Sequence, residues 1–171
     1  MTPGVVIRLR PPDVAGPLRI GATGEETLEA LRRLGDPVFL CGFRGGRPGW
    51  GVDRPSGLSI GCHFDEADRV EAIQLGSPDR ADAVIYNGLD LFRIPADEVV
   101  AALRARTAVT EEENGHTYLA RGLSLSLWRP VTPEEPGGED EDRDGRFFAT
   151  ALLALPGYRR LYSATGMPDS T

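Results

Sequence analysis

The residues best suited to chemistry in this sequence are two cysteines and two histidines, which could act as nucleophiles, bases or metal ligands. Cys62 and His63 are adjacent, Cys41 precedes them, and no cysteines have the Cys-x-x-Cys spacing typical of a zinc site. Because neighbouring residues of a strand point to opposite faces, Cys62 and His63 cannot act together on a strand. The pattern therefore predicts buried core thiols, no bound metal and no Cys-His nucleophile. His116, beside an Asn-Gly turn, is predicted to be exposed.

Two other segments have the residue types of ligand-binding loops but lack the required spacing. Five glycines lie between residues 42 and 51, but the sequence has no lysine to complete a phosphate-binding loop. The carboxylates of Asp65, Glu66 and Asp68 lack the spacing and the closing glutamate of a calcium loop. The sequence therefore predicts no catalytic residues, no cofactor and no metal site.

The charge of the chain is concentrated in one segment. The net charge is −7, and residues 134–144 alone contain seven acidic side chains and one arginine. The remainder is nearly neutral and has no basic stripe, which argues against a nucleic-acid partner. No apolar stretch has the length of a signal peptide or a membrane span. We therefore expect a cytoplasmic protein that binds neither nucleic acid nor membrane.

The elements that position these residues are organised around a stretch that occurs twice, at residues 57–64 (GLSIGCHF) and 122–129 (GLSLSLWR). Both copies alternate in the way that predicts a strand with one buried face. The apolar face would carry Leu58, Ile60, Cys62 and Phe64 in the first copy, and Leu123, Leu125 and Leu127 in the second. The opposite face would carry Ser59, Gly61 and His63 in the first copy, and Ser124, Ser126 and Trp128 in the second.

A helix is predicted to precede each copy. The first begins at Thr23, whose side chain can cap it, and Glu26 completes a capping box. Its apolar stripe is Leu28, Leu31 and Leu34, with Gly35 at the C-terminal cap. The second runs from Pro95 to about residue 106, with Val99, Val100 and Leu103 facing inward.

Strands are predicted around these helices. They cover residues 5–9, 38–43, 50–53, 70–75, 84–86, 89–92, 109–113, 117–120 and 147–155. The strand at 147–155 is apolar on both faces, so we expect it to be central or covered. Residues 130–145 form an acidic loop, and Tyr158, Leu161 and Tyr162 of the C-terminal tail are candidates to dock back onto the fold.

The order of elements predicts an α+β fold with two tandem helix-plus-antiparallel-sheet repeats. The first repeat covers residues 1–82, the second covers residues 83–157 with the acidic loop 130–145, and a tail covers residues 158–171. The repeats either pack side by side or share one extended sheet. The alternative explanation is chance similarity between two amphipathic hairpins.

One segment carries a resemblance to known families. The residues IGAT at 20–23, then Leu28, then LGDP at 34–37 resemble the helix motif of the small outer-membrane-lipoprotein (SmpA/OmlA) domains. The layout of the chain is also similar to the β-lactamase-inhibitor-protein-like fold, which implies a non-enzymatic binder with a concave sheet face. The chain departs from these families because it has no lipobox cysteine near Met1 and no intra-repeat disulfide pairs. Inhibition of a β-lactamase is therefore not carried over.

The face opposite the apolar one is the predicted binding site. Its candidate partner-binding residues are Ser59, His63, Ser124, Ser126 and Trp128. We expect a non-enzymatic module, of inhibitor or immunity type, that binds a partner protein through this sheet face. An ordinary solvated face, or one covered by the tail, is the simpler reading. The alternative function is an enzyme or small-ligand-binding protein with a pocket between the repeats. The oligomeric state is not predicted.

Overall fold

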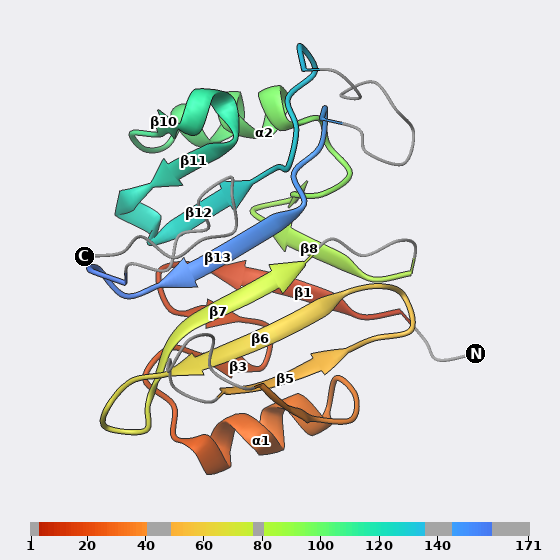
Figure 1. The fold of residues 1–171 in the computed structure, drawn as a ribbon, viewed down its shortest axis with the longest axis vertical. Coiled ribbons are helices and arrows are strands. Elements are labelled where there is room, and N and C mark those ends of the chain that lie inside the picture. Colours follow the sequence, from red (N-terminus) through yellow and green to blue (C-terminus); the bar gives the residue numbers. More distant parts are fainter. Residues whose placement is uncertain (1–3, 41–48, 77–80, 136–144, 159–171) are drawn as a thin grey trace.

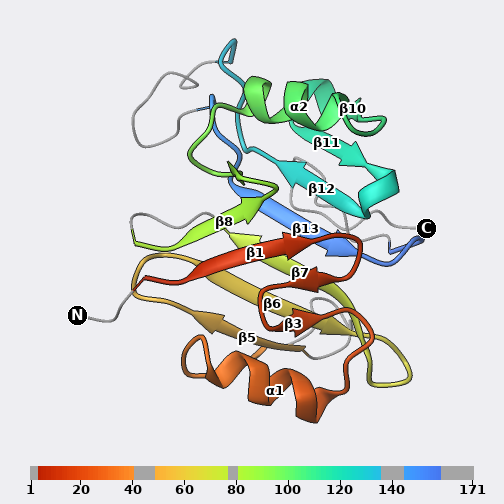
Figure 2. The same cartoon turned by 180° about the vertical axis from the view of Figure 1, so that it is seen from behind.

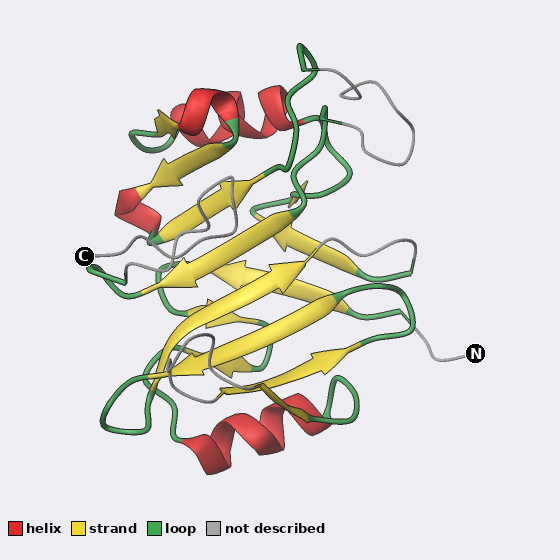
Figure 3. Cartoon of the chain, viewed as in Figure 1, coloured by secondary structure: helices red, strands yellow, loops and turns green. Residues whose placement is uncertain are grey.

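A computed structural model describes residues 4–40, 49–76, 81–135 and 145–158 of the chain. The protein is an α+β fold in which strands predominate over two α-helices (Figure 3). Two sheets lie one behind the other, and the helices flank the smaller sheet at its two ends (Figures 1 and 2). Among the described residues, no helix is long and apolar enough to cross a membrane.

The larger sheet has eight strands in the order β10-β11-β12-β13-β7-β6-β5-β4. Every neighbouring pair in it is antiparallel. The strands are β4 Val38–Leu40, β5 Gly49–Asp53, β6 Ser59–Phe64, β7 Val70–Gly76, β10 Thr110–Glu112, β11 Thr117–Ala120, β12 Leu125–Trp128 and β13 Thr150–Ala154. As expected from its apolar sequence, β13 is central, because it pairs with β12 on one side and β7 on the other.

The smaller sheet has five strands in the order β3-β2-β1-β8-β9. They are β1 Val6–Arg10, β2 Val14–Ala15, β3 Leu18–Arg19, β8 Ala83–Tyr86 and β9 Leu89–Asp90. β1 pairs with β8 in parallel, so residues from the start and the middle of the chain lie side by side. The β8–β9 turn is made by Asn87 and Gly88, both with positive φ, as the Asn-Gly signal predicts.

The first helix, α1 (Gly24–Arg32), is capped as the sequence predicts. The Thr23 side chain accepts a hydrogen bond from Glu26 N, and the Glu26 carboxylate accepts one from Thr23 N. The second helix, α2 (Ala96–Arg104), has Pro95 at its N-cap and no side-chain cap. Its predicted inward residues, Val99, Val100 and Leu103, are buried.

The inner face of the larger sheet is covered mainly by the smaller sheet. Each α-helix has nine residues and is therefore only about 13 Å long, too short to cover this face alone. Eight strands span roughly 34 Å across the sheet. The smaller sheet fills the space between the helices, so that Ile7, Leu9 and Val84 join Ile60 and Leu127 in one hydrophobic core.

Two local predictions need correction. Gly35 is not a left-handed cap, because α1 ends at Arg33 with right-handed geometry. A Cβ atom on Gly35 would lie 2.7 Å from Val52 Cγ1, so this glycine permits close packing of the chain after α1 against β5. The second Gly-Leu-Ser is not part of a strand, because residues 121–123 form a 3-10 turn and Ser124 is left-handed.

Candidate functional site

The outer face of the larger sheet is the face that points away from the smaller sheet, and no described helix or strand covers it (Figure 1). Alternation and register assign its residues. They are Ser59, Gly61 and His63 of β6, Ala72, Gln74 and Gly76 of β7, Thr150, Leu152 and Ala154 of β13, Ser126 and Trp128 of β12, and Thr117 and Leu119 of β11. The predicted alternation is confirmed, because Ile60, Cys62 and Phe64 are buried on the inner face.

The register places the predicted binding residues in three rows across the sheet. Ser59 and Trp128 lie in one row, with Gly76 and Thr150 between them. His63 and Ser124 lie in another, where Ala154 N donates a hydrogen bond to the Ser124 carbonyl at 3.1 Å. Each of these pairs is three strand spacings apart, or roughly 14 Å.

The middle row contains Gly61, Gln74, Leu152 and Ser126. The predicted residues are thus spread over one surface and do not form a compact cluster. His63 and Trp128 lie in different outer rows and on strands separated by two others. Such a layout suits contact with a broad surface, whereas a reaction needs its groups within hydrogen-bond reach of one another.

The outer face is depleted of charge. None of the paired outer-face residues of β6, β7, β13 and β12 is aspartate, glutamate or arginine, and most have small side chains. At β11 the Glu113 carboxylate accepts a hydrogen bond from Thr117 Oγ1 at 3.2 Å. Ser59 is exposed and the other predicted binding residues are half-buried. Leu152, at the centre of the face, is only 6% exposed. The face is therefore less open than the sequence predicts.

One described contact on this face involves the C-terminal segment. The Tyr158 ring lies against the His63 ring, with their centroids 6.5 Å apart. Tyr158 thus docks back as expected, whereas Leu161 and Tyr162 lie outside the described residues. This contact accounts for part of the burial of His63.

His116 is buried, not exposed as expected. It is 8% exposed, and its ring nitrogens lie 3.1 Å from the Arg129 carbonyl and 3.0 Å from the Glu135 carboxylate. Glu135 also accepts a hydrogen bond from Thr132 N. This backbone hydrogen bond, with that to His116, lowers the pKa of the Glu135 carboxyl. Residues 129–135 pack over the turn that holds His116. The local sequence around residue 116 does not predict this contact.

Cys62 is a core residue, as predicted. Burial raises the pKa of its thiol to about 12, so the thiol stays protonated and unreactive at neutral pH. Cys62 lies on the inner face and His63 on the outer face, which separates the two groups. Cys41 lies outside the described residues. No group of three or more His, Cys, Asp or Glu side chains that could hold a metal ion occurs among the described residues.

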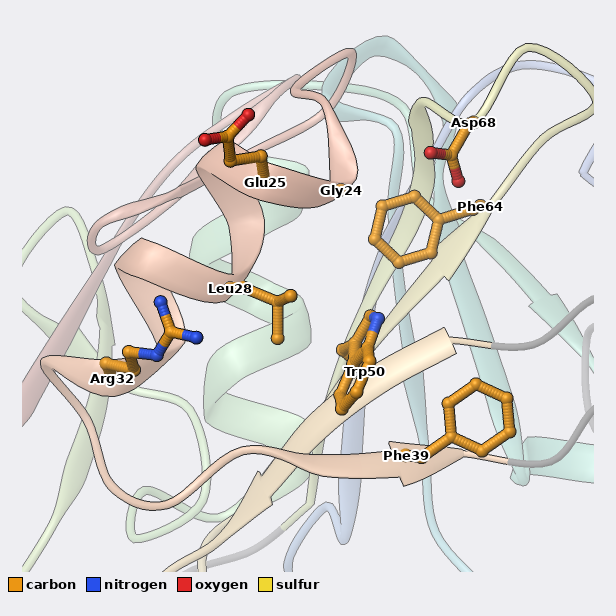
Figure 4. Close-up of a pocket in the computed structure, with 8 residues that line it drawn as sticks. All are labelled: Gly24, Glu25, Leu28, Arg32, Phe39, Trp50, Phe64 and Asp68. Atoms are coloured by element: carbon orange, nitrogen blue, oxygen red, sulfur yellow. The ribbon is translucent and has the colours of Figure 1, made fainter.

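A groove beside α1 was missed by sequence reasoning. Its cavity volume is about 490 Å³, and residues between 24 and 68 line it, so it does not lie between the two predicted repeats. Figure 4 shows Leu28 of α1 on one side and the rings of Phe64, Trp50 and Phe39 on the other. Phe39 and Trp50 pack edge to face, with centroids 5.4 Å apart.

The groove exists because β4 is an edge strand. Phe39, Trp50 and Cys62 are neighbours in register on the inner face, but α1 and the smaller sheet do not cover the outermost of them. Phe39 is therefore 55% exposed. The alternating sequence 38–43 predicted a strand with Phe39 on its apolar face. Which strand occupies the edge depends on non-local pairing, which the pattern does not specify.

No protein-family model, curated protein or solved structure matches this chain. The geometry of the outer face and of the groove therefore carries the functional argument.

Proposed function

We propose that this chain is a non-enzymatic protein-binding module that acts through the outer face of its larger sheet. The observation that carries the proposal is the absence of charged side chains at the paired outer-face positions of β6, β7, β13 and β12. A sheet face in contact with water usually carries polar and charged side chains. The cores of protein interfaces are instead depleted of charge and enriched in aromatic residues such as Trp128.

The symmetry of the strand order supports the proposal that the chain contains two tandem repeats. In the larger sheet, β4 to β7 run from one edge to the centre and β10 to β13 run from the other edge to the centre. In the smaller sheet, β1 lies between the β2–β3 hairpin and the β8–β9 hairpin. Each hairpin leads directly into a nine-residue helix.

The centre of this symmetry lies on the outer face. Gln74 pairs with Leu152 in the middle of the β7–β13 ladder. A two-fold exchange about this pair brings Ser59 onto Ser124 and His63 onto Trp128, as the two Gly-Leu-Ser copies predict. Four of the five candidate binding residues thus fall on one another in this exchange, and Ser126 falls on Gly61.

The similarity of the layout of the chain to the β-lactamase-inhibitor-protein-like fold adds a class of partner to the proposal. An inhibitor or immunity-type protein masks the surface of an enzyme or toxin. A broad uncharged face is suited to form the buried, water-excluded core of such an interface. Nothing in the described geometry favours an enzyme or a small-ligand protein with a pocket between the repeats. The groove beside α1, and a second cavity lined by residues between 17 and 30, both lie within the first predicted repeat.

A charge placed on the outer face tests this function. Ser59 is exposed on the face, so Ser59→Arg should fold normally and abolish capture of the partner in affinity purification from native cells. Trp128→Ala should weaken the same capture, because it removes the aromatic anchor. Ala101→Arg, at an exposed position of α2, is the matched control and should retain the partner.

Two results would contradict the proposal. One is capture of the same protein by wild type and Ser59→Arg in equal amounts, which would place the contact elsewhere. The other is the absence of any protein retained by wild type and lost by Ser59→Arg. A chain ending at residue 158 should be included, because increased capture by it would show that the tail competes for the face.

A further inference from the structure

The groove beside α1 has aromatic walls that no described residue covers completely. Phe39 is 55% exposed, and Trp50 and Leu28 are half-buried. Large apolar side chains exposed together around a groove mark a contact site more often than a solvated surface. This surface belongs to the inner face at the β4 edge, so it is separate from the outer face and goes beyond the function proposed above.

The two ends of the groove carry opposite charges. Glu25 and Asp68 lie on either side of Gly24 at one end, and Arg32 lies toward the other end (Figure 4). Within the part of the chain that the structure describes, none of these three side chains forms an ion pair or a hydrogen bond. All three are exposed. Their charges are therefore available to a ligand.

The two edge strands of the larger sheet differ in charge. β10, at the far edge, contains Glu111 and Glu112, and charged edge strands discourage pairing with other proteins. β4 has the sequence VFL and lacks such protection. Of the two edge strands, β4 is therefore the apolar one, and it carries the groove.

We propose that this groove binds an extended segment of a partner protein with a basic, an apolar and an acidic side chain at alternate positions. The basic side chain faces Glu25 and Asp68, the apolar side chain lies against Trp50, and the acidic side chain faces Arg32. Glu25 and Arg32 are seven residues apart on α1, or about 10 Å along the helix axis. An extended segment points every second side chain to one side, and residues four apart are separated by about 13 Å, so that flexible side chains can reach charges about 10 Å apart.

The shape of the groove selects a peptide over a small molecule. Small-molecule sites bury most of the surface of their ligand. The groove is an open trough, since its outer wall is the exposed ring of Phe39. A segment that remains attached to its own protein needs only one side covered. Its charged ends contribute specificity more than affinity.

The proposal is tested with a display library of linear heptapeptides panned against the full chain. The enriched peptides should contain basic, apolar and acidic residues at alternate positions. A synthetic peptide with Arg, Leu and Glu in these positions should change the fluorescence of Trp50 in a Trp128→Phe background. Replacing its Leu by Ser should weaken binding at least tenfold, because the apolar contact is lost.

Glu25→Lys provides the sharpest variant. It lies in the exposed first turn of α1 and should weaken the synthetic peptide roughly tenfold, since an attraction becomes a repulsion. Glu98→Lys makes the same change in the first turn of α2, away from the groove, and should leave binding unchanged. The groove proposal is overturned if the library yields no such pattern, or if both variants bind the peptide equally.

The outer-face variant separates this proposal from the proposed function. Ser59→Arg should leave peptide affinity unchanged, because Ser59 does not line the groove. Loss of peptide binding in Ser59→Arg would contradict the assignment to the groove. Retained peptide binding alongside lost partner capture would show that the two surfaces are independent.

Discussion

At the scale of single residues, Arg54 and Asp82 form a buried ion pair. Arg54 Nε lies 2.6 Å from Asp82 Oδ2, and Asp82 is 0% exposed. Asp82 also accepts hydrogen bonds from Ser56 Oγ and from Val5 N. Burial acts to raise the pKa of the Asp82 carboxyl, but the hydrogen bonds from Arg54, Ser56 and Val5 outweigh it and lower the pKa below its usual value.

Asp82→Asn should destabilise the protein by about 3–5 kcal/mol, because it leaves the Arg54 guanidinium buried without a counter-charge. Urea denaturation measures this loss as a lower midpoint with an unchanged slope. Asp13→Asn is the control, since Asp13 pairs with Arg19 at the surface at 3.6 Å. Its effect should stay below about 1 kcal/mol. Equal effects of the two variants would show that the buried pair contributes no more than a surface one.

The same pair predicts a pH dependence. The pKa of Asp82 is lowered in the folded state, so its contribution to stability is complete above the unfolded pKa of about 3.9. It is lost as the pH falls through the lower folded-state pKa. The difference in unfolding free energy between wild type and Asp82→Asn should therefore be constant from pH 5 to 8 and shrink below pH 4. A difference that grows on acidification would contradict the assignment.

Residues with local partners could be predicted from the sequence, and those with distant partners could not. The Thr23–Glu26 capping box depends on a spacing of three residues, and it forms as expected. Arg54 and Asp82 are 28 residues apart, and no local pattern pairs them. His116 was misplaced for the same reason, because its partners Arg129 and Glu135 come from a later segment.

At the scale of elements, alternation identified the strands but not their neighbours. The outer and inner faces of β6 and β12 follow from the period of two. Strands were predicted at β1, β8 and β9, but β2 and β3 were missed because they have two residues each, too few to show a period. The separate sheet that these five strands form depends on pairing between distant residues, such as that of β1 with β8. The groove was missed as well, since the groove depends on β4 being at the edge.

The two helices differ in how their N-termini are capped. Thr23→Ala should destabilise the fold by about 1 kcal/mol, because the amide of Glu26 loses its hydrogen-bond acceptor at the start of α1. Thr23→Ser keeps an acceptor oxygen at that position and should retain most of the stability. Thermal unfolding followed by circular dichroism measures both variants. Equal loss in the two would assign the role of Thr23 to its methyl group and not to its hydroxyl.

At the scale of the whole molecule, residues before and after position 82 are joined in both sheets. β1 pairs with β8 in the smaller sheet, and β7 pairs with β13 in the larger one. Arg93 adds a hydrogen bond to the Asp82 carbonyl at 2.9 Å. Even if the chain arose from two repeats, each half alone would leave a central strand edge unpaired and part of the core exposed. The whole chain should therefore unfold as one cooperative unit.

This cooperativity can be measured because the two tryptophans lie in different halves. Trp50 is in β5 and Trp128 is in β12. Variants with Trp50→Phe or Trp128→Phe leave one reporter each, and adding Leu31→Ala to both removes a fully buried side chain from the first half. Leu31→Ala should cost about 2–5 kcal/mol and shift the unfolding midpoint equally at both reporters. Leu155→Ala, at an exposed position, should shift neither. A shift of the midpoint at Trp50 alone would mean that the halves unfold separately. The two halves would then be independently stable domains that associate through the shared sheets.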